Sequence, residues 1–173
     1  MDRHANLFTN MGMTWEEICA DPILADLPYK IESDRWGNVI MSPPAGANHC
    51  DYQGEILAAL LRLKPGGRAR AEYPLRTNQG VKAIDVAWVS KERHGQRPEK
   101  SIVHLLAPEI CVEVFSASNS VPEIEEKTLL YFERGAQERW TCDEAGSMSF
   151  FDPSGSIKRF RLCPKFPVRI KRV

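Results

Sequence analysis

The sequence has no apolar run as long as a membrane-spanning helix, and its first ten residues lack the apolar stretch of a secretory signal. Its five cysteines form no CxxC pair, so neither a zinc knuckle nor a disulfide framework is indicated. We therefore expect a cytoplasmic protein with reduced thiols. No GxSxG motif occurs, and no spacing places His49, His94 or His104 near a nucleophile, which disfavours a serine or cysteine hydrolase.

The chain also has no net charge, because 23 basic residues balance 23 acidic ones, and this argues against a strongly basic coat for nucleic acid. The balance is uneven along the chain, since no acidic residue follows Asp152. The basic residues after it are Lys158, Arg159, Arg161, Lys165, Arg169, Lys171 and Arg172. Such a strip suits phosphate binding. We favour the alternative that these charges protect an exposed strand edge.

Turn residues and apolar spacing predict one domain, residues 1–173, of the α/β class. A capping box at Thr14 and Glu17 predicts a first helix, and a hairpin is expected within 29–41. Helices are predicted at 49–63, capped by Asn48, and at 120–134, with a loop at 91–100. Strands are predicted at 69–77, 81–90, 109–116, 138–142, 148–151, 157–163 and 168–173. We divide the domain into an N-terminal extension (1–47), a core (48–143) and basic C-terminal strands (144–173).

Two acidic residues, Asp85 and Glu113, interrupt strands that are otherwise apolar on both faces, as central strands of a sheet are. Alternation puts Asp85 on the face opposite Ile84, Val86 and Trp88. Lys127 lies on the apolar face of the second long helix, where an ammonium is costly unless an acid faces it. Either each residue is an isolated structural group, with the lysine reaching solvent, or the three form one site.

A shared site would suit a hard cation. Carboxylates of neighbouring strands, with waters and a substrate phosphate, are the ligands that Mg²⁺ prefers. Such an ion polarises a phosphoryl oxygen and lowers the pKa of a bound water. Lys127 would then orient that water or neutralise charge that builds up on the phosphate. The combination of two acidic strands and a lysine helix favours a metal-dependent phosphodiesterase over three unrelated structural groups.

An ordered set of segments resembles the putative restriction endonuclease family of uncharacterised bacterial proteins, within the PD-(D/E)XK nuclease superfamily. The segments are AIDVAWV at 83–89, PEICVEVFSAS at 108–118, EK at 126–127 with Tyr131 and Gly135, and ERW at 138–140. The resemblance extends from the hairpin at Tyr29 to about Asp143. It implies a restriction-endonuclease-like core in the order α-β-β-β-α-β, with a mixed sheet flanked by helices.

The resemblance also assigns roles. Asp85 and Glu113 match the metal-binding acids of the motif, and the backbone carbonyl of Val114 would be a further ligand. Glu55 matches a place where related nucleases carry an additional acid, although an exposed helix glutamate is at least as good an interpretation. His49 matches a histidine of the family, and we favour a helix N-terminal role for it.

Two positions depart from the superfamily pattern. Phe115 takes the usual place of the lysine two residues beyond the glutamate, and the family pattern moves that lysine to the next helix, where Lys127 lies. Ile84 replaces the proline before the motif aspartate, which shapes the backbone rather than the chemistry.

The resulting hypothesis is an endonuclease that hydrolyses DNA with Mg²⁺ or Mn²⁺ by in-line attack of water, as a homodimer with no membrane association. The alternative is a catalytically inactive nucleic-acid-binding or regulatory module on the same fold. The sequence does not separate DNA from RNA as the substrate.

Overall fold

The computed structural model describes residues 12–115 and 120–172, and its main feature is one six-stranded sheet between two helices. The N-terminal elements are α1 (Trp15–Ala20), α2 (Pro22–Ala25), β1 (Lys30–Ser33) and β2 (Val39–Ser42). The remaining elements are α3 (Ala47–Leu63), β3 (Gly67–Thr77), β4 (Gly80–Ser90), α4 (Lys91–Gly95), β5 (Ile110–Val114), α5 (Val121–Glu133), β6 (Glu138–Cys142), β7 (Met148–Asp152) and β8 (Gly155–Ile157).

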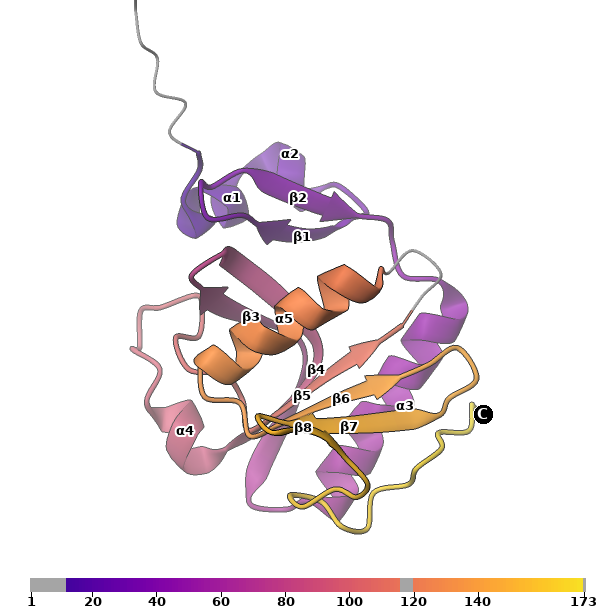
Figure 1. The fold of residues 1–173 in the computed structure, drawn as a ribbon. Helices are drawn as coiled ribbons and strands as arrows, with labels where there is room; N and C mark the ends of the chain where they lie inside the picture. The colour runs from indigo at the N-terminus through magenta and orange to yellow at the C-terminus, as the bar shows by residue number, and fades with distance from the viewer. Residues whose placement is uncertain (1–11, 116–119, 173) are drawn as a thin grey trace, which may run out of the picture.

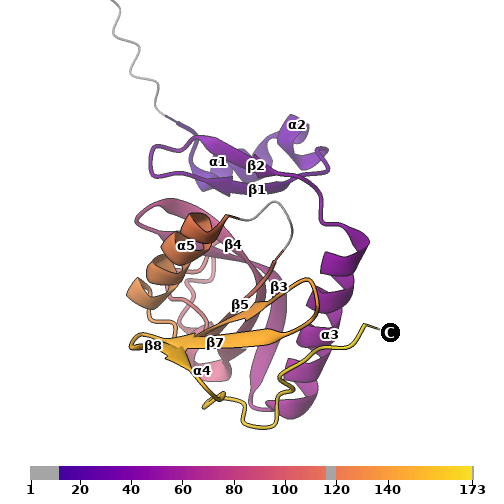
Figure 2. The ribbon, with the colours of Figure 1, turned by 45° about the vertical axis from the view of Figure 1, so that its right-hand side comes forward.

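The sheet runs in chain order from β3 to β8, and only the β5–β6 pair is parallel. A parallel pair needs a crossover connection, and α5 supplies it. α3 and α5 lie on opposite faces of the sheet (Figures 1 and 2). The predicted mixed sheet flanked by helices, in the order α-β-β-β-α-β, is therefore confirmed. None of the described helices combines the length and apolarity needed to span a membrane.

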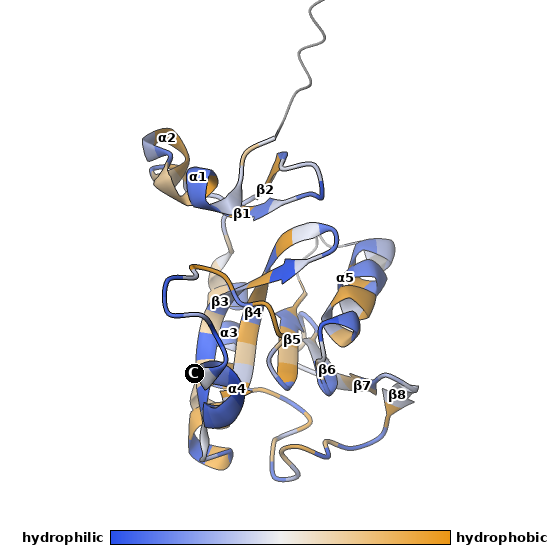
Figure 3. Ribbon diagram, turned by 90° about the vertical axis from the view of Figure 1, so that its left-hand side faces the viewer, coloured by the Kyte–Doolittle hydropathy of each residue, from blue (hydrophilic) through white to orange (hydrophobic). Residues whose placement is uncertain are grey.

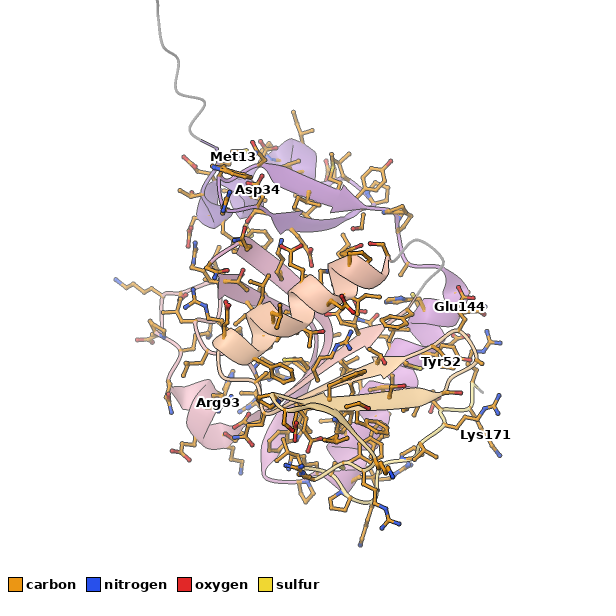
Figure 4. All side chains as sticks on the ribbon, viewed as in Figure 1. Met13, Asp34, Tyr52, Arg93, Glu144 and Lys171 are labelled. Atoms are coloured by element: carbon orange, nitrogen blue, oxygen red, sulfur yellow. The ribbon has the colours of Figure 1, made fainter. Side chains whose placement is uncertain are left out.

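Apolar residues concentrate on β4 and β5 at the centre of the sheet (Figure 3). On one face they pack with α3, where Ile56 and Leu60 are fully buried. On the other face they pack with α5 through Leu130 and Tyr131. On the α3 side, the Tyr52 hydroxyl donates to the backbone carbonyl of Glu144 (3.1 Å), and these two labelled residues lie side by side in Figure 4.

The C-terminal segment differs from the prediction of two strands at 157–163 and 168–173. After Ile157 the described chain, which ends at Arg172, forms no further strand, and its strand-like pairing is limited to an isolated bridge between Arg169 and Ser147. The backbone N–H groups of Arg161 and Leu162 donate to Glu138 Oε1, each at 2.8 Å, instead of to a neighbouring strand. The alternating apolar residues instead insert into the core. Phe160 packs 4.7 Å from the Trp140 ring centroid, beside Phe166 and Ile170.

Three other local predictions can be compared with the structure. The capping box of Thr14 and Glu17 is formed, and Ser120 caps α5 through the backbone N–H of Glu123. α3 starts at Ala47 with Gly46 as its N-cap, so Asn48 lies inside the first turn rather than at the cap. The predicted loop at 91–100 contains the short helix α4, because the Ser90 hydroxyl accepts from the backbone N–H of Arg93 and initiates a turn.

The β1–β2 hairpin lies across the start of β4, above the body of the sheet in Figure 1. Ser33 Oγ accepts from the backbone N–H of Val81 (3.0 Å), and Glu32 Oε1 accepts from that of Ala83 (2.9 Å). An apolar cluster that includes Trp15, Ile18 and Val81 completes the contact. The described part of the predicted N-terminal extension is thus fixed against the core, with one face of β1 directed at β4.

The alternation of β4 breaks at Asp85. Ile84 packs on the α5 side, whereas Val86 and Trp88 pack on the α3 side, although alternation predicts one shared face. Across the β3–β4 ladder, Glu72 lies opposite Asp85 and has a φ of +48°. A non-glycine residue in this left-handed region marks local strain. The strand pair therefore turns about its axis at the position of the predicted metal ligand.

Candidate active site

A cavity of about 700 Å³ lies between the hairpin, the first turn of α3, the middle of β4, the end of β5, and α5. Asp85, Glu113, Val114, Lys127 and His49 all line it. The residues that the sequence singled out thus converge on one space. Glu55 is the exception, because it is half-buried on α3 outside the residues that line the cavity.

Asp85 is almost fully buried, and both of its carboxylate oxygens are engaged. Oδ2 accepts from the backbone N–H of Val114 on β5 (2.8 Å), while Oδ1 accepts from Lys30 Nζ (2.5 Å). His49 Nε2 lies 3.6 Å from the same Oδ1. Burial alone would raise the pKa of Asp85, but His49 and the positive charge of Lys30 outweigh it and hold that pKa well below its ordinary value. Asp85 is therefore an anion.

Glu113 lies beside Asp85 but in a different electrostatic state. Val86 of β4 pairs with Val112 of β5, so continuing this antiparallel register brings Asp85 opposite Glu113. Glu113 Oε1 accepts from the Tyr131 hydroxyl of α5 (2.6 Å). Burial, followed by the negative charge of Asp85, raises the pKa of Glu113 to about 7. A carboxyl that binds its proton this firmly needs a cation to become fully ionised at neutral pH.

Lys127 extends from α5 into the cavity with only 14% of its side chain exposed. Its acidic partner is Glu32 of the hairpin, at 2.9 Å, rather than either strand acid of the predicted site. Burial works to lower the pKa of Lys127, but the charges of Glu113 and Glu32 outweigh it and raise that pKa. The ammonium is thus held in the charged form within reach of the field of Glu113.

Sequence reasoning missed the polar residues that support this set. Lys30 and Glu32 alternate on β1, so they share the face that meets β4, and a Lys-x-Glu pattern in a strand is the signal that could have found them. On α3, Gln53 lies one turn beyond His49 and donates to the Glu72 carboxylate and to the backbone carbonyl of Asp85, both at 2.8 Å. These two hydrogen bonds hold Glu72 and Asp85 in place where the β3–β4 pair is strained.

The donor set is compatible with a magnesium ion. Asp85 and Glu113 offer carboxylate oxygens and Val114 a backbone carbonyl, all of which are hard oxygen donors. Among the described residues, no group of three or more histidine, cysteine or acidic side chains is arranged to hold a metal. A site with only two carboxylates suits Mg²⁺, which keeps several waters, better than Zn²⁺, which takes a full set of protein ligands.

Comparison with known proteins gives a family and a fold. The family model Uma2, described as putative restriction endonuclease, matches residues 23–161. A crystal structure of a putative nuclease belonging to DUF820 from Anabaena variabilis ATCC 29413 superposes with a TM-score of 0.66 at 21% identity, covering 82% of this chain and 80% of that one. No curated protein matches. Since the family model covers most of the sequence, the chain belongs to the Uma2 putative restriction endonuclease family.

Proposed function

We propose that this protein is a magnesium-dependent endonuclease that hydrolyses phosphodiester bonds of DNA. Family membership and the nuclease-like fold support a nuclease. The observation that carries the proposal is that Asp85, Glu113 and Lys127, from three separate elements, line one cavity. Two acids can hold a divalent ion and a lysine can stabilise charge on a phosphate, and these two functions together suit hydrolysis of a phosphodiester.

In this proposal Asp85, Glu113 and the Val114 carbonyl hold the metal. When bound, Mg²⁺ would polarise the phosphoryl oxygen and lower the pKa of a water ligand. The backbone N–H of Val114 holds Asp85 Oδ2, and the Tyr131 hydroxyl holds Glu113 Oε1, so both carboxylates are oriented before any ligand arrives. Preorganised ligands lose little conformational freedom on binding.

Lys127 would stabilise negative charge on the phosphate. Its ammonium is fixed by Glu32 and largely excluded from solvent, and a charge in such a place acts through a low effective dielectric. Mn²⁺ would serve as a substitute metal. A homodimer would bring two such sites to the two strands of a duplex, and light scattering of the purified protein tests this association.

Mn²⁺ titration by isothermal calorimetry, followed by a plasmid-cleavage assay, tests the proposal. Asp85→Ala and Glu113→Ala should each abolish metal binding and cleavage. Lys127→Ala should bind Mn²⁺ and fail to cleave. Glu55→Ala is the matched control, because it removes an acid outside the cavity and should behave like the wild type. Wild-type metal binding by both strand-acid variants would show that the site assignment is wrong.

A second candidate function is nucleic-acid binding without catalysis. It is favoured by the seven basic residues after Asp152, all of which are exposed. It predicts that the protein binds DNA in a salt-sensitive way. This binding should survive Asp85→Ala and weaken when Arg169, Lys171 and Arg172 are neutralised. Absence of retention at low salt contradicts this candidate.

A further inference from the structure

We propose that Lys30 competes with the metal ion for Asp85, so that this lysine of the N-terminal hairpin sets the metal affinity of the site. The inference rests on the proposed function, because it assumes that Asp85 is a metal ligand. Its starting point is the contact of Lys30 Nζ with Asp85 Oδ1 at 2.5 Å. The ammonium thus already occupies a cation position on the carboxylate.

The other oxygen of Asp85 offers no easy alternative. Oδ2 accepts the backbone N–H of Val114, which belongs to the β5 backbone and cannot withdraw without disturbing the sheet. The Asp85 side chain is only 3% exposed, so few directions remain from which a second cation can approach. A divalent ion and an ammonium on the same buried carboxylate repel each other strongly. Metal binding therefore requires Lys30 to leave Oδ1.

A second partner for the released ammonium is already nearby. Glu72 Oε2 lies 3.5 Å from Lys30 Nζ, and the other oxygen, Oε1, is held by Gln53 at 2.8 Å. The Lys30 side chain is 22% exposed and lines the cavity, so it has room to move. The hairpin need not move with it, because Glu32 and Ser33 hold β1 to β4 independently. The exchange is a side-chain movement from Asp85 to Glu72.

The other cavity lysine provides a matched comparison. Lys127 carries the same charge and lines the same cavity, but its hydrogen-bond partner is Glu32 instead of a proposed metal ligand. Removing Lys127 therefore measures the general effect of one fewer positive charge near the metal. If removing Lys30 increases the metal affinity by more than removing Lys127 does, the difference measures competition for Asp85.

The test is Mn²⁺ affinity by calorimetry for the wild type, Lys30→Met, Lys127→Met and Lys30→Arg. An ammonium that holds Oδ1 about nine-tenths of the time weakens apparent affinity about tenfold. Lys30→Met should therefore bind Mn²⁺ about tenfold more tightly than the wild type and clearly more tightly than Lys127→Met. Lys30→Arg, which keeps the charge, should stay near the wild type. Equal or weaker binding by Lys30→Met, or an equal gain in Lys127→Met, overturns the proposal.

A measurement on the wild type keeps the proposal testable if Lys30→Met does not fold. On addition of Mg²⁺, the side-chain ¹⁵Nζ signal of Lys30, assigned by its loss in Lys30→Arg, should shift, whereas that of Lys127 should shift less. An unmoved Lys30 signal at saturating Mg²⁺ overturns the competition. Failure of the proposed function looks different, because Asp85→Ala would then bind metal like the wild type, or no variant would bind it.

Discussion

Glu113→Gln should make the metal-free protein less sensitive to pH. The folded state raises the pKa of Glu113 from its ordinary value of 4.5 to about 7, first through burial and then through the charge of Asp85. Between these two values the folded protein binds one more proton at this position than the unfolded chain does. Its contribution to stability is therefore fully present below pH 4.5 and is lost as the pH rises through 7.

The size of the effect follows from the two pKa values. Each unit of difference corresponds to about 1.4 kcal/mol. Linkage over the interval from pH 5 to pH 7 then costs the wild type about 2 kcal/mol of unfolding free energy through this one carboxyl. Glutamine has nearly the same shape and does not titrate, so Glu113→Gln removes the cost. The unfolding free energy of the variant, taken relative to that of the wild type, should therefore be about 2 kcal/mol higher at pH 7 than at pH 5.

Urea denaturation in the presence of EDTA at the two pH values measures this difference. Tyr131→Phe is the control, because it removes the 2.6 Å hydrogen bond and keeps the carboxyl. It should destabilise the protein and show a pH dependence at least as large as that of the wild type, because the lost hydrogen bond is one of the causes that lower the pKa of Glu113. A free-energy difference between Glu113→Gln and the wild type that is the same at pH 5 and pH 7 would refute the reasoning.

Three further predictions concern other contacts. Lys127→Met or Glu32→Gln alone leaves a buried charge unpaired and should cost about 3 kcal/mol in urea denaturation, whereas the double variant should cost less than the sum. Asp85→Asn should lower the pKa of His49, followed by NMR titration, because interaction with Asp85 is the main cause that raises it; an unchanged value would contradict the contact. Phe160→Ala should destabilise the protein by about 3 kcal/mol and expose the C-terminal segment to limited proteolysis, and protease resistance equal to the wild type would show that the aromatic contacts do not anchor it.

The central part of the site follows from the sequence because local periodicity controls it. Asp85 and Glu113 lie in apolar strands that can only be central, and Lys127 lies on the buried face of an amphipathic helix, so the fold brings them together. The twist at Asp85 was not predictable in this way. The twist depends on the strained backbone of Glu72 on the neighbouring strand and on the hydrogen bond from Gln53 of α3 to Asp85. Both join residues that are distant in sequence.

Periodicity misled the prediction for the C-terminal segment, and for a related reason it could not show where the N-terminal hairpin docks. The alternating apolar residues after Ile157 match a strand as well as they match a segment anchored by its side chains. Contacts with earlier parts of the chain, such as that of Phe160 with Trp140, decide between the two. The hairpin was predicted as an element, but its role depends on where it docks. That docking is set by Ser33 and Glu32 meeting backbone donors of β4, about fifty residues later.

The hairpin also explains why the two strand acids differ. β1 supplies a cation to Asp85 through Lys30 and an anion to Lys127 through Glu32, so it completes two separate ion pairs. Lys127 is thereby paired away from Glu113, whose hydrogen bond comes from the neutral hydroxyl of Tyr131. The charges of Lys127 and Lys30 offset only part of the cost of burying Glu113 beside Asp85, so the pKa of Glu113 rises. In the proposed function a divalent ion would remove this cost, so the imbalance that makes Glu113 sensitive to pH would also favour metal binding there.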